Sequence, residues 1–241
     1  MPADLLPTRE SPVQLQPLLQ LHNVACERDD QLLFAPISLA VNTGQIVQLE
    51  GPNGVGKTSL LRSICGLSSR YRGEMFWRGQ PLVQKRFEFA SESLYLGHHA
   101  GLKAALNARE NLLWWAASRG IDAKPTADNA LAEVGLAGYE LSPCYQLSAG
   151  QQRRVALARL FLADVPLWIL DEPFTAIDKY GVAELESWLV AHAARGGAVL
   201  LTTHQPLSMD ALVKVELSAA DDAEFFFAEN DIDNREVAYD R

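Results

Sequence analysis

Apolar runs alternate with amphipathic stretches along most of the chain, and this alternation predicts its secondary structure. Short apolar runs bounded by Asp, Pro or Gly predict strands at 18–24, 32–41, 46–49, 74–77, 94–96, 167–170 and 198–202. Start and end signals predict helices at 57–66, 107–119, 126–134, 148–163 and 178–195. Strands that alternate with helices are typical of an α/β domain with a mostly parallel sheet covered on both faces.

The helices predicted in the middle of the chain indicate a lobe inserted into this domain, at about 98–160. The helix at 107–119 starts with Asn107, and Glu110 three positions later completes the pattern of a capping box. Residues 1–17 are rich in proline and show no period, which indicates a loose leader. We expect one domain over 18–218 and an acidic tail over 219–241, with a short last strand near its three phenylalanines.

Acidic residues are concentrated near the end of the sequence. The chain has 241 residues and a net charge of −9, and residues 216–241 hold nine acidic side chains against two arginines. The preceding part is therefore nearly neutral, and its one short basic run is Arg153 with Arg154. Non-specific nucleic-acid binding needs a positive surface, so we expect no nucleic-acid partner.

The composition, 48% hydrophobic and 21% charged, is that of an ordinary soluble globular protein. The three cysteines lie far apart with no C-x-x-C pair, which disfavours a disulfide framework or a thiolate metal site and fits a reducing compartment. No apolar run approaches the roughly 18 residues of a membrane span. The first ten residues also lack the pattern of a signal peptide, so we expect a cytosolic location.

A phosphate-binding loop lies between a predicted strand and a predicted helix. Eight consecutive residues match the pattern G-x-x-x-x-G-K-[ST], namely Gly51, Pro52, Asn53, Gly54, Val55, Gly56, Lys57 and Thr58. Glycines at these positions let backbone N–H groups face phosphate oxygens at a helix N-terminus. Lys57 would then reach the β- and γ-phosphates and Thr58 would hold Mg²⁺, with Ser59 as a further candidate nucleotide contact. The predicted ligands are ATP and Mg²⁺.

Two adjacent carboxylates end the apolar strand at 167–170. In a P-loop enzyme, Asp171 would hold Mg²⁺ through water, while Glu172 would orient and deprotonate the water that attacks the γ-phosphate. A strand that ends in Asp-Glu is commonly only a solvated strand end. Together with the P-loop, however, the pair predicts a hydrolytic site.

A third motif ends at Gln151, 20 residues before Asp171. Its Ser148 and Gln151 fit a capping box for the helix that follows. With Leu147, Ala149 and Gly150, these residues resemble the LSGGQ signature of the ATP-binding-cassette (ABC) ATPases, with alanine in place of the first glycine. The resemblance extends from about residue 18 to residue 215. It implies a P-loop NTPase of the ABC ATPase type, with a mostly parallel sheet core, a β subdomain and an inserted helical lobe.

The resemblance also implies roles for individual residues. Asp178, in the loop after Glu172, would face a second copy of the chain, and His204 would contact the γ-phosphate and act with Lys57 and Glu172 in catalysis. The P-loop covers only one face of ATP. The second copy would therefore supply Ser148, Gly150 and Gln151 as the complementary anion-binding surface, which predicts a homodimer.

Two positions depart from the usual pattern of that family. His98 stands where most members carry a glutamine that contacts Mg²⁺ and senses the membrane partner. Arg28 stands at the usual position of the aromatic residue that stacks on adenine. A guanidinium plane can stack on a base, but a solvated surface arginine is an equal alternative.

Three stretches, 97–103, 146–154 and 173–178, narrow the resemblance to the ATP-binding subunits of the haem exporter of bacterial cytochrome c maturation. That family implies a peripheral subunit on the cytoplasmic face of the inner membrane, bound to integral CcmB-like and CcmC-like subunits. Its ATP hydrolysis would drive release of a haem-loaded chaperone. The alternatives are an ATPase subunit of another ABC importer or exporter with different cargo, and a soluble P-loop kinase. Of Trp114 and Trp115, we expect one in the core and one available to a partner.

Overall fold

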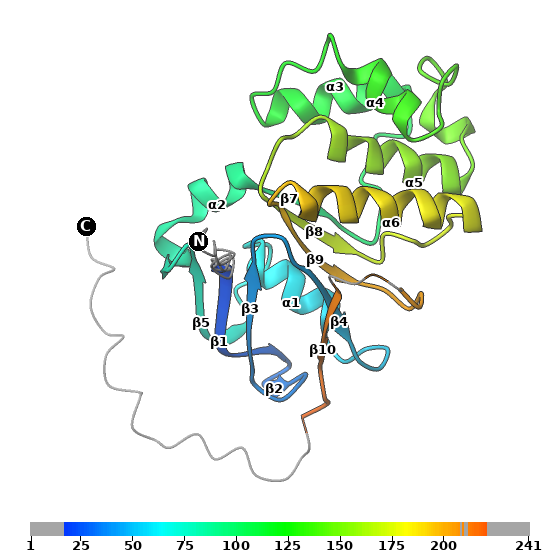
Figure 1. Cartoon of the computed structure of the whole chain (residues 1–241). Coiled ribbons are helices and arrows are strands. Elements are labelled where there is room, and N and C mark those ends of the chain that lie inside the picture. Colours follow the sequence, from blue (N-terminus) through cyan, green and yellow to red (C-terminus); the bar gives the residue numbers. More distant parts are fainter. Residues whose placement is uncertain (1–16, 208, 210–211, 221–241) are drawn as a thin grey trace, which may run out of the picture.

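Two five-stranded sheets and a group of helices make up the computed structural model, which describes residues 17–207, 209 and 212–220 (Figure 1). One sheet is antiparallel and contains β1 (Pro17–Arg28), β2 (Gln31–Leu32), β3 (Ile37–Asn42), β5 (Tyr71–Trp77) and β6 (Gln80–Pro81). The other is parallel, in the order β10 (Leu212–Glu216), β4 (Ile46–Glu50), β9 (Ala198–Thr202), β8 (Leu167–Asp171), β7 (Ser93–Leu96).

The helices fall into two groups (Figure 1). Near the sheets are α1 (Lys57–Ile64), the 3₁₀ turn η1 (Leu82–Gln84) and α2 (Arg86–Glu92). The others are α3 (Ala108–Ser118), α4 (Ala127–Glu133), η2 (Cys144–Gln146), α5 (Ala149–Leu157), η3 (Ala158–Phe161) and α6 (Lys179–Ala194). None of the helices in the described ranges is both long and apolar enough to cross a membrane.

The parallel sheet is covered on both faces, as the sequence predicts. Successive side chains of a strand point to opposite faces, and in β8 they enter two different cores. Trp168 and Leu170 pack with residues of α3, α4, α5 and α6, whereas Leu167 and Ile169 pack with α1 and the antiparallel sheet. The sheet therefore lies between the helical lobe and the β subdomain.

Two predicted elements differ in the structure, and two observed elements were not predicted. The strand expected at 32–41 is broken, because Pro36 has no N–H to donate to a ladder and Phe34 forms an isolated bridge with Ala219. The helix expected at 148–163 is α-helical only to Leu157 and continues as the 3₁₀ turn η3. The helix α2 and the strand β10 were not predicted. The strand expected near the three phenylalanines lies outside the described residues, as does most of the expected leader and acidic tail.

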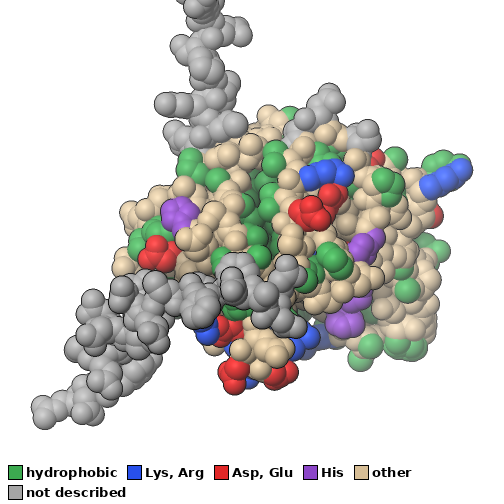
Figure 2. Space-filling view, turned by 90° about the horizontal axis from the view of Figure 1, so that it is seen from below, with side chains coloured by type: hydrophobic (Ala, Val, Ile, Leu, Met, Phe, Trp, Pro, Cys, Tyr) green, Lys and Arg blue, Asp and Glu red, His purple; other side chains and the backbone are tan. Residues whose placement is uncertain are grey.

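Charged side chains of both signs lie next to one another on the face seen from below (Figure 2). On this face, the described lysines and arginines gather into no continuous basic patch.

Candidate functional site

The P-loop connects β4 to α1 and bends at three glycines with positive φ, Gly51 (139°), Gly54 (83°) and Gly56 (111°). Only glycine adopts such angles readily. Gly56 precedes the first residue of α1, and a Cβ atom there would lie 2.9 Å from the ring of Phe34. No side chain caps this helix start, so its N–H groups are available to an anion.

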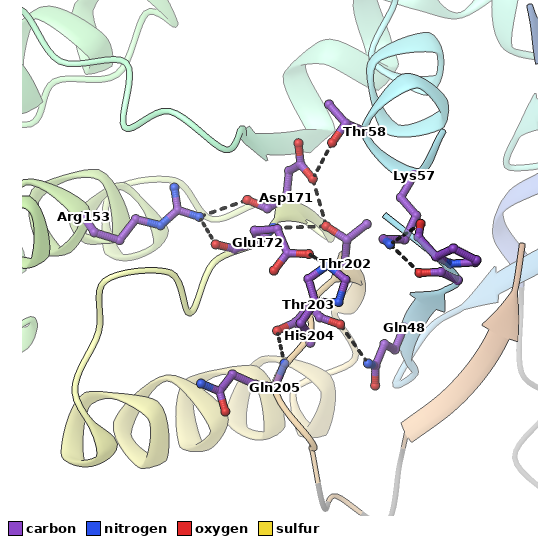
Figure 3. Close-up of polar contacts among 12 residues, drawn as sticks. Gln48, Lys57, Thr58, Arg153, Asp171, Glu172, Thr202, Thr203, His204 and Gln205 are labelled. Carbon is purple, nitrogen blue, oxygen red and sulfur yellow. Dashed lines mark hydrogen bonds and ion pairs between the residues drawn. The ribbon is translucent and has the colours of Figure 1, made fainter. Parts of the chain in front are cut away.

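Lys57 is the first residue of α1 and folds back over the loop (Figure 3). Its Nζ donates to the carbonyl oxygens of Gly51 at 2.6 Å and Pro52 at 3.2 Å. The ammonium group therefore lies at the mouth of the loop, where the sequence predicts the β- and γ-phosphates.

Asp171 and Thr58 form a pair suited to a hard metal ion (Figure 3). The Thr58 hydroxyl donates to Asp171 Oδ1 at 3.1 Å, and the Thr202 hydroxyl donates to the same oxygen at 2.8 Å. Asp171 is 1% exposed, and its Oδ2 has no hydrogen-bond partner among the described residues. A buried oxygen without a partner calls for an explanation. Bound Mg²⁺ would supply one, because it prefers carboxylate and hydroxyl oxygens.

Glu172 leaves the sheet in an unusual backbone conformation. Its φ is +49°, in the left-handed region that non-glycine residues seldom adopt. Its N–H donates to the carbonyl oxygen and the hydroxyl of Thr202, at 3.1 and 3.0 Å. The carboxylate Oε1 then lies 3.5 Å from His204 Nε2, so a carboxylate and an imidazole face each other across the carboxyl ends of β8 and β9.

A cavity of about 360 Å³ brings these groups together. It is lined by Arg28, Asn53, Gly54, Gly56, Lys57, Thr58, Ser59, His98, Glu172, Thr175 and His204. Residues from five separate parts of the chain thus meet in one place, including both positions that depart from the usual family pattern. A larger groove of about 1030 Å³ lies between β5 and α2, but it contains no P-loop residue. The chemistry therefore favours the smaller cavity.

Eight candidate residues are not among those that line this cavity. Gly51, Pro52, Val55 and Asp171 lie within two positions of lining residues, whereas Ser148, Gly150, Gln151 and Asp178 lie in other segments of the chain. Ser148 caps α5 in a full capping box, in which its hydroxyl accepts from the Gln151 N–H at 3.2 Å and the Gln151 amide oxygen accepts from the Ser148 N–H at 2.9 Å. Gly150 lies against Ala176, whose carbonyl oxygen would be 2.7 Å from a Cβ. Asp178 caps α6 by accepting from the Gly181 N–H at 2.8 Å. These last four residues are on the surface of the same chain but outside the P-loop cavity.

Sequence reasoning assigned no site role to Thr175, which lines the cavity, or to Thr202 and Arg153, which support it. Thr202 joins Asp171 to the Glu172 backbone, and the register of β8 and β9 places it opposite Asp171. Its position at the end of a predicted parallel strand was a usable signal, because ligands bind at the carboxyl edge of such sheets. Arg153 was noted only for its charge, yet it is buried against the loop of Glu172.

Comparison with known proteins defines the class. A sequence model of the family described as ABC transporter matches residues 34–175, which is more than half of the chain. A solved ABC transporter ATP-binding protein from Pyrococcus furiosus superposes with a TM-score of 0.73 at 23% identity, over 84% of this chain and 99% of that chain. The ATP-binding subunit of another ABC transporter superposes with a TM-score of 0.70 at 26% identity, over 78% and 79%. The chain belongs to the ABC transporter family and is one of its ATP-hydrolysing subunits.

Curated relatives show to which narrower family within this class the chain belongs. The cytochrome c biogenesis ATP-binding export protein CcmA of Hahella chejuensis is 54% identical over 84% of this chain and 97% of its own length. The proteins of the same name from Pseudomonas fluorescens and Aliivibrio fischeri are 53% and 50% identical, over 80% and 83% of this chain and 91% and 99% of their own lengths. The chain therefore belongs to the family of cytochrome c biogenesis ATP-binding export proteins, as the sequence motifs indicate.

Proposed function

We propose that the chain hydrolyses Mg-ATP in the cavity at the carboxyl edge of its parallel sheet, and that this powers haem export in cytochrome c maturation. The observation that carries the proposal is the single cavity in which the P-loop, Glu172 and His204 meet. The domain that does this spans about 18–218, with the helical lobe at about 98–160. The released product would be the haem-loaded chaperone.

Nucleotide binding follows from the positive groups of the cavity. The N–H groups of residues 51–58 and the Lys57 ammonium bind the phosphates, and Ser59 adds a hydroxyl at the start of α1. Arg28 is an exposed residue of the cavity wall, and its planar guanidinium stacks on adenine. Thr58 and Asp171 hold Mg²⁺, which neutralises phosphate charge when bound.

Hydrolysis needs a base on the water side of the γ-phosphate. The Glu172 carboxylate accepts a proton from the attacking water as the water oxygen bonds to phosphorus and the bond to ADP breaks. His204 lies 3.5 Å from that carboxylate and donates to the γ-phosphate. Thr202 holds the backbone of Glu172 and one oxygen of Asp171, so both carboxylates keep a fixed distance from the P-loop.

The complete site requires two copies of the chain. The cavity of one copy contains no part of its own signature segment, residues 148–151, although that segment presents an exposed helix N-terminus. A second copy would supply Ser148, Gly150 and Gln151 to the outer face of ATP, with Asp178 near the junction. ATP would close this homodimer, and hydrolysis would reopen it.

Exposed aromatic side chains offer contacts for the membrane subunits, which we expect to be CcmB-like and CcmC-like on the cytoplasmic face of the inner membrane. Trp115 packs against the core, whereas Trp114 is 52% exposed with Lys103 Nζ 4.2 Å from its ring centroid. Phe87 on α2 is 95% exposed beside the groove along β5. Large exposed apolar groups are common at protein–protein contacts.

The experiment is release of the haem-loaded chaperone from the complex of this chain with its membrane subunits in lipid nanodiscs. ATP should release the chaperone, measured by haem absorbance, whereas ATP with the Glu172→Gln variant should leave it bound. Equal release with the variant, or with no nucleotide, would contradict the proposed coupling. Hydrolysis without any effect on the chaperone would instead indicate a different cargo.

A further inference from the structure

Arg153 is a buried arginine in α5, and all three of its guanidinium nitrogens donate to backbone carbonyl oxygens. It is 3% exposed, and a guanidinium has five N–H donors. Nε donates to Pro173 O at 3.1 Å, Nη1 to Gly97 O at 2.8 Å and His98 O at 3.4 Å, and Nη2 to Asp171 O at 3.0 Å and Glu172 O at 2.8 Å. Burial lowers the pKa of this group, and the nearby carboxylates of Asp171 and Glu172 oppose the shift.

The carbonyls that Arg153 gathers come from the two loops that carry the chemistry. One loop follows β7 and brings His98 to the nucleotide cavity, and the other follows β8 and brings Glu172 there. Arg153 itself lies one turn into the helix that Ser148 caps. A single side chain of α5 thus contacts the loop after β7 that carries His98 and the loop after β8 that carries Glu172. Figure 3 shows its contacts with Asp171 and Glu172.

The strained backbone of Glu172 makes the position of its carboxylate depend on the hydrogen bonds from Arg153. Its φ of +49° is strained for a residue with a side chain, so the surrounding contacts must hold it. Thr202 fixes the N–H of Glu172, and Arg153 fixes the carbonyl oxygens on both sides of its Cα, those of Asp171 and Glu172. The Thr175 N–H also donates to the Glu172 carbonyl oxygen, at 3.2 Å. Without the guanidinium, the peptide after Glu172 keeps only this turn hydrogen bond among the described residues, and we expect the carboxylate to shift from its place opposite His204.

We propose that Arg153 is a positioning residue that holds the Glu172 carboxylate at the γ-phosphate and ties the His98 loop to the same frame. When a second copy contacts the N-terminus of α5 and moves this helix, the hydrogen bonds of Arg153 carry the movement to both loops. The inference rests on the proposed role of Glu172 as the base. It adds a residue from the helical lobe to the determinants of the hydrolysis rate.

The test replaces Arg153 with lysine, which keeps the charge but donates from one point and cannot span both loops. Arg153→Lys should lower kcat roughly 10²-fold, the effect of a misplacement of about 1 Å, while the KM for ATP changes little. The matched control is Arg119→Lys. Arg119 also donates to backbone carbonyls, those of Ala90 and Ser93, but touches no residue of the nucleotide cavity, so kcat should stay near the parent value.

A double variant separates positioning from general loss of structure. If Arg153 acts through Glu172, adding Arg153→Lys to Glu172→Gln should slow hydrolysis no further, because the base is already absent. A full additional loss in that background, or an unchanged kcat in Arg153→Lys alone, would overturn the inference. If Arg153→Lys yields no folded protein by its thermal midpoint, Arg153→Gln, which keeps two N–H donors, is measured in the same cycle.

The same variants distinguish a failure of the proposed hydrolytic function from a failure of the proposed role of Arg153. Parent-rate hydrolysis by Glu172→Gln would remove the proposed base and with it the proposed chemistry. A slow Glu172→Gln variant beside a fast Arg153→Lys variant would remove only the positioning role.

Discussion

Mild acid should destabilise the chain through His192, an imidazole on α6 that is 7% exposed. Its ring stacks on Trp168 with centroids 3.8 Å apart and an interplanar angle of 6°. Burial lowers the pKa of His192 to about 4, and the positive charge of Arg195 adds to this, while Pro166, Ala198 and Asp164 oppose it. The folded chain therefore resists a proton that the unfolded chain accepts near pH 6.5.

The size of the effect follows from that difference in pKa. Above about pH 6.5 the contribution of the neutral ring to the free energy of unfolding is complete, and it falls by about 1.4 kcal/mol per pH unit as the pH drops toward 4. The total loss is about 3 kcal/mol, a large share of the stability of an ordinary domain.

Urea denaturation of the parent and of His192→Phe between pH 7.5 and 4.5 measures this loss. Phenylalanine keeps the stack on Trp168 but cannot take a proton, and carboxylates contribute equally to both proteins. The parent should therefore lose stability more steeply than the variant below pH 6.5. Parallel profiles would refute the reasoning, because they would show that protonation of His192 costs nothing in the folded state.

Three further results follow from the nucleotide site. Asp171→Asn should raise the Mg²⁺ concentration needed for half-maximal hydrolysis about 10-fold or more, and an unchanged requirement in a Mg²⁺ titration would argue against a metal at this carboxylate. His98→Ala should leave ATP affinity nearly unchanged and reduce the stimulation of hydrolysis by the membrane subunits, while His98→Gln keeps most of it. Lost ATP affinity with full stimulation would place His98 in the nucleotide site alone. Mixed dimers of Lys57→Ala and Ser148→Arg chains should regain one working site that neither variant forms by itself, and verified mixed dimers without activity would contradict a shared site.

Local signals predict the elements whose ends are set by near neighbours. Asn107 and Ser148 form the capping boxes that their sequence spacing indicates, and Asp178 caps α6. The strand break before Ile37 had one local signal, Pro36, which the apolar pattern on either side of it outweighed. The isolated bridge of Phe34 with Ala219 had no local signal, because the two residues are distant in the sequence. The strand β10 escaped prediction because its side chains are mostly only partly buried or exposed.

The residues of the site also divide into those that a local sequence pattern marks and those that act through distant contacts. The P-loop and the Asp171–Glu172 pair are contiguous strings that follow strands, so the sequence alone marks them. Arg153 and Thr202 act on partners 56 and 31 positions away, and no local pattern records such pairings. The sequence could indicate the chemical groups of the cavity, but only the fold shows what holds them in place.

Hydrolysis by Glu172→Gln is the most direct test of the central claim that this chain is an ATPase whose base is Glu172. The amide cannot accept the proton of water, so the rate should fall by about 10² to 10⁴, while a fluorescent ATP analogue should bind with parent affinity. Because ATP then persists, light scattering should show a doubled mass in ATP but not in ADP. Hydrolysis at the parent rate, or a monomer that binds ATP without ever pairing, would contradict the account.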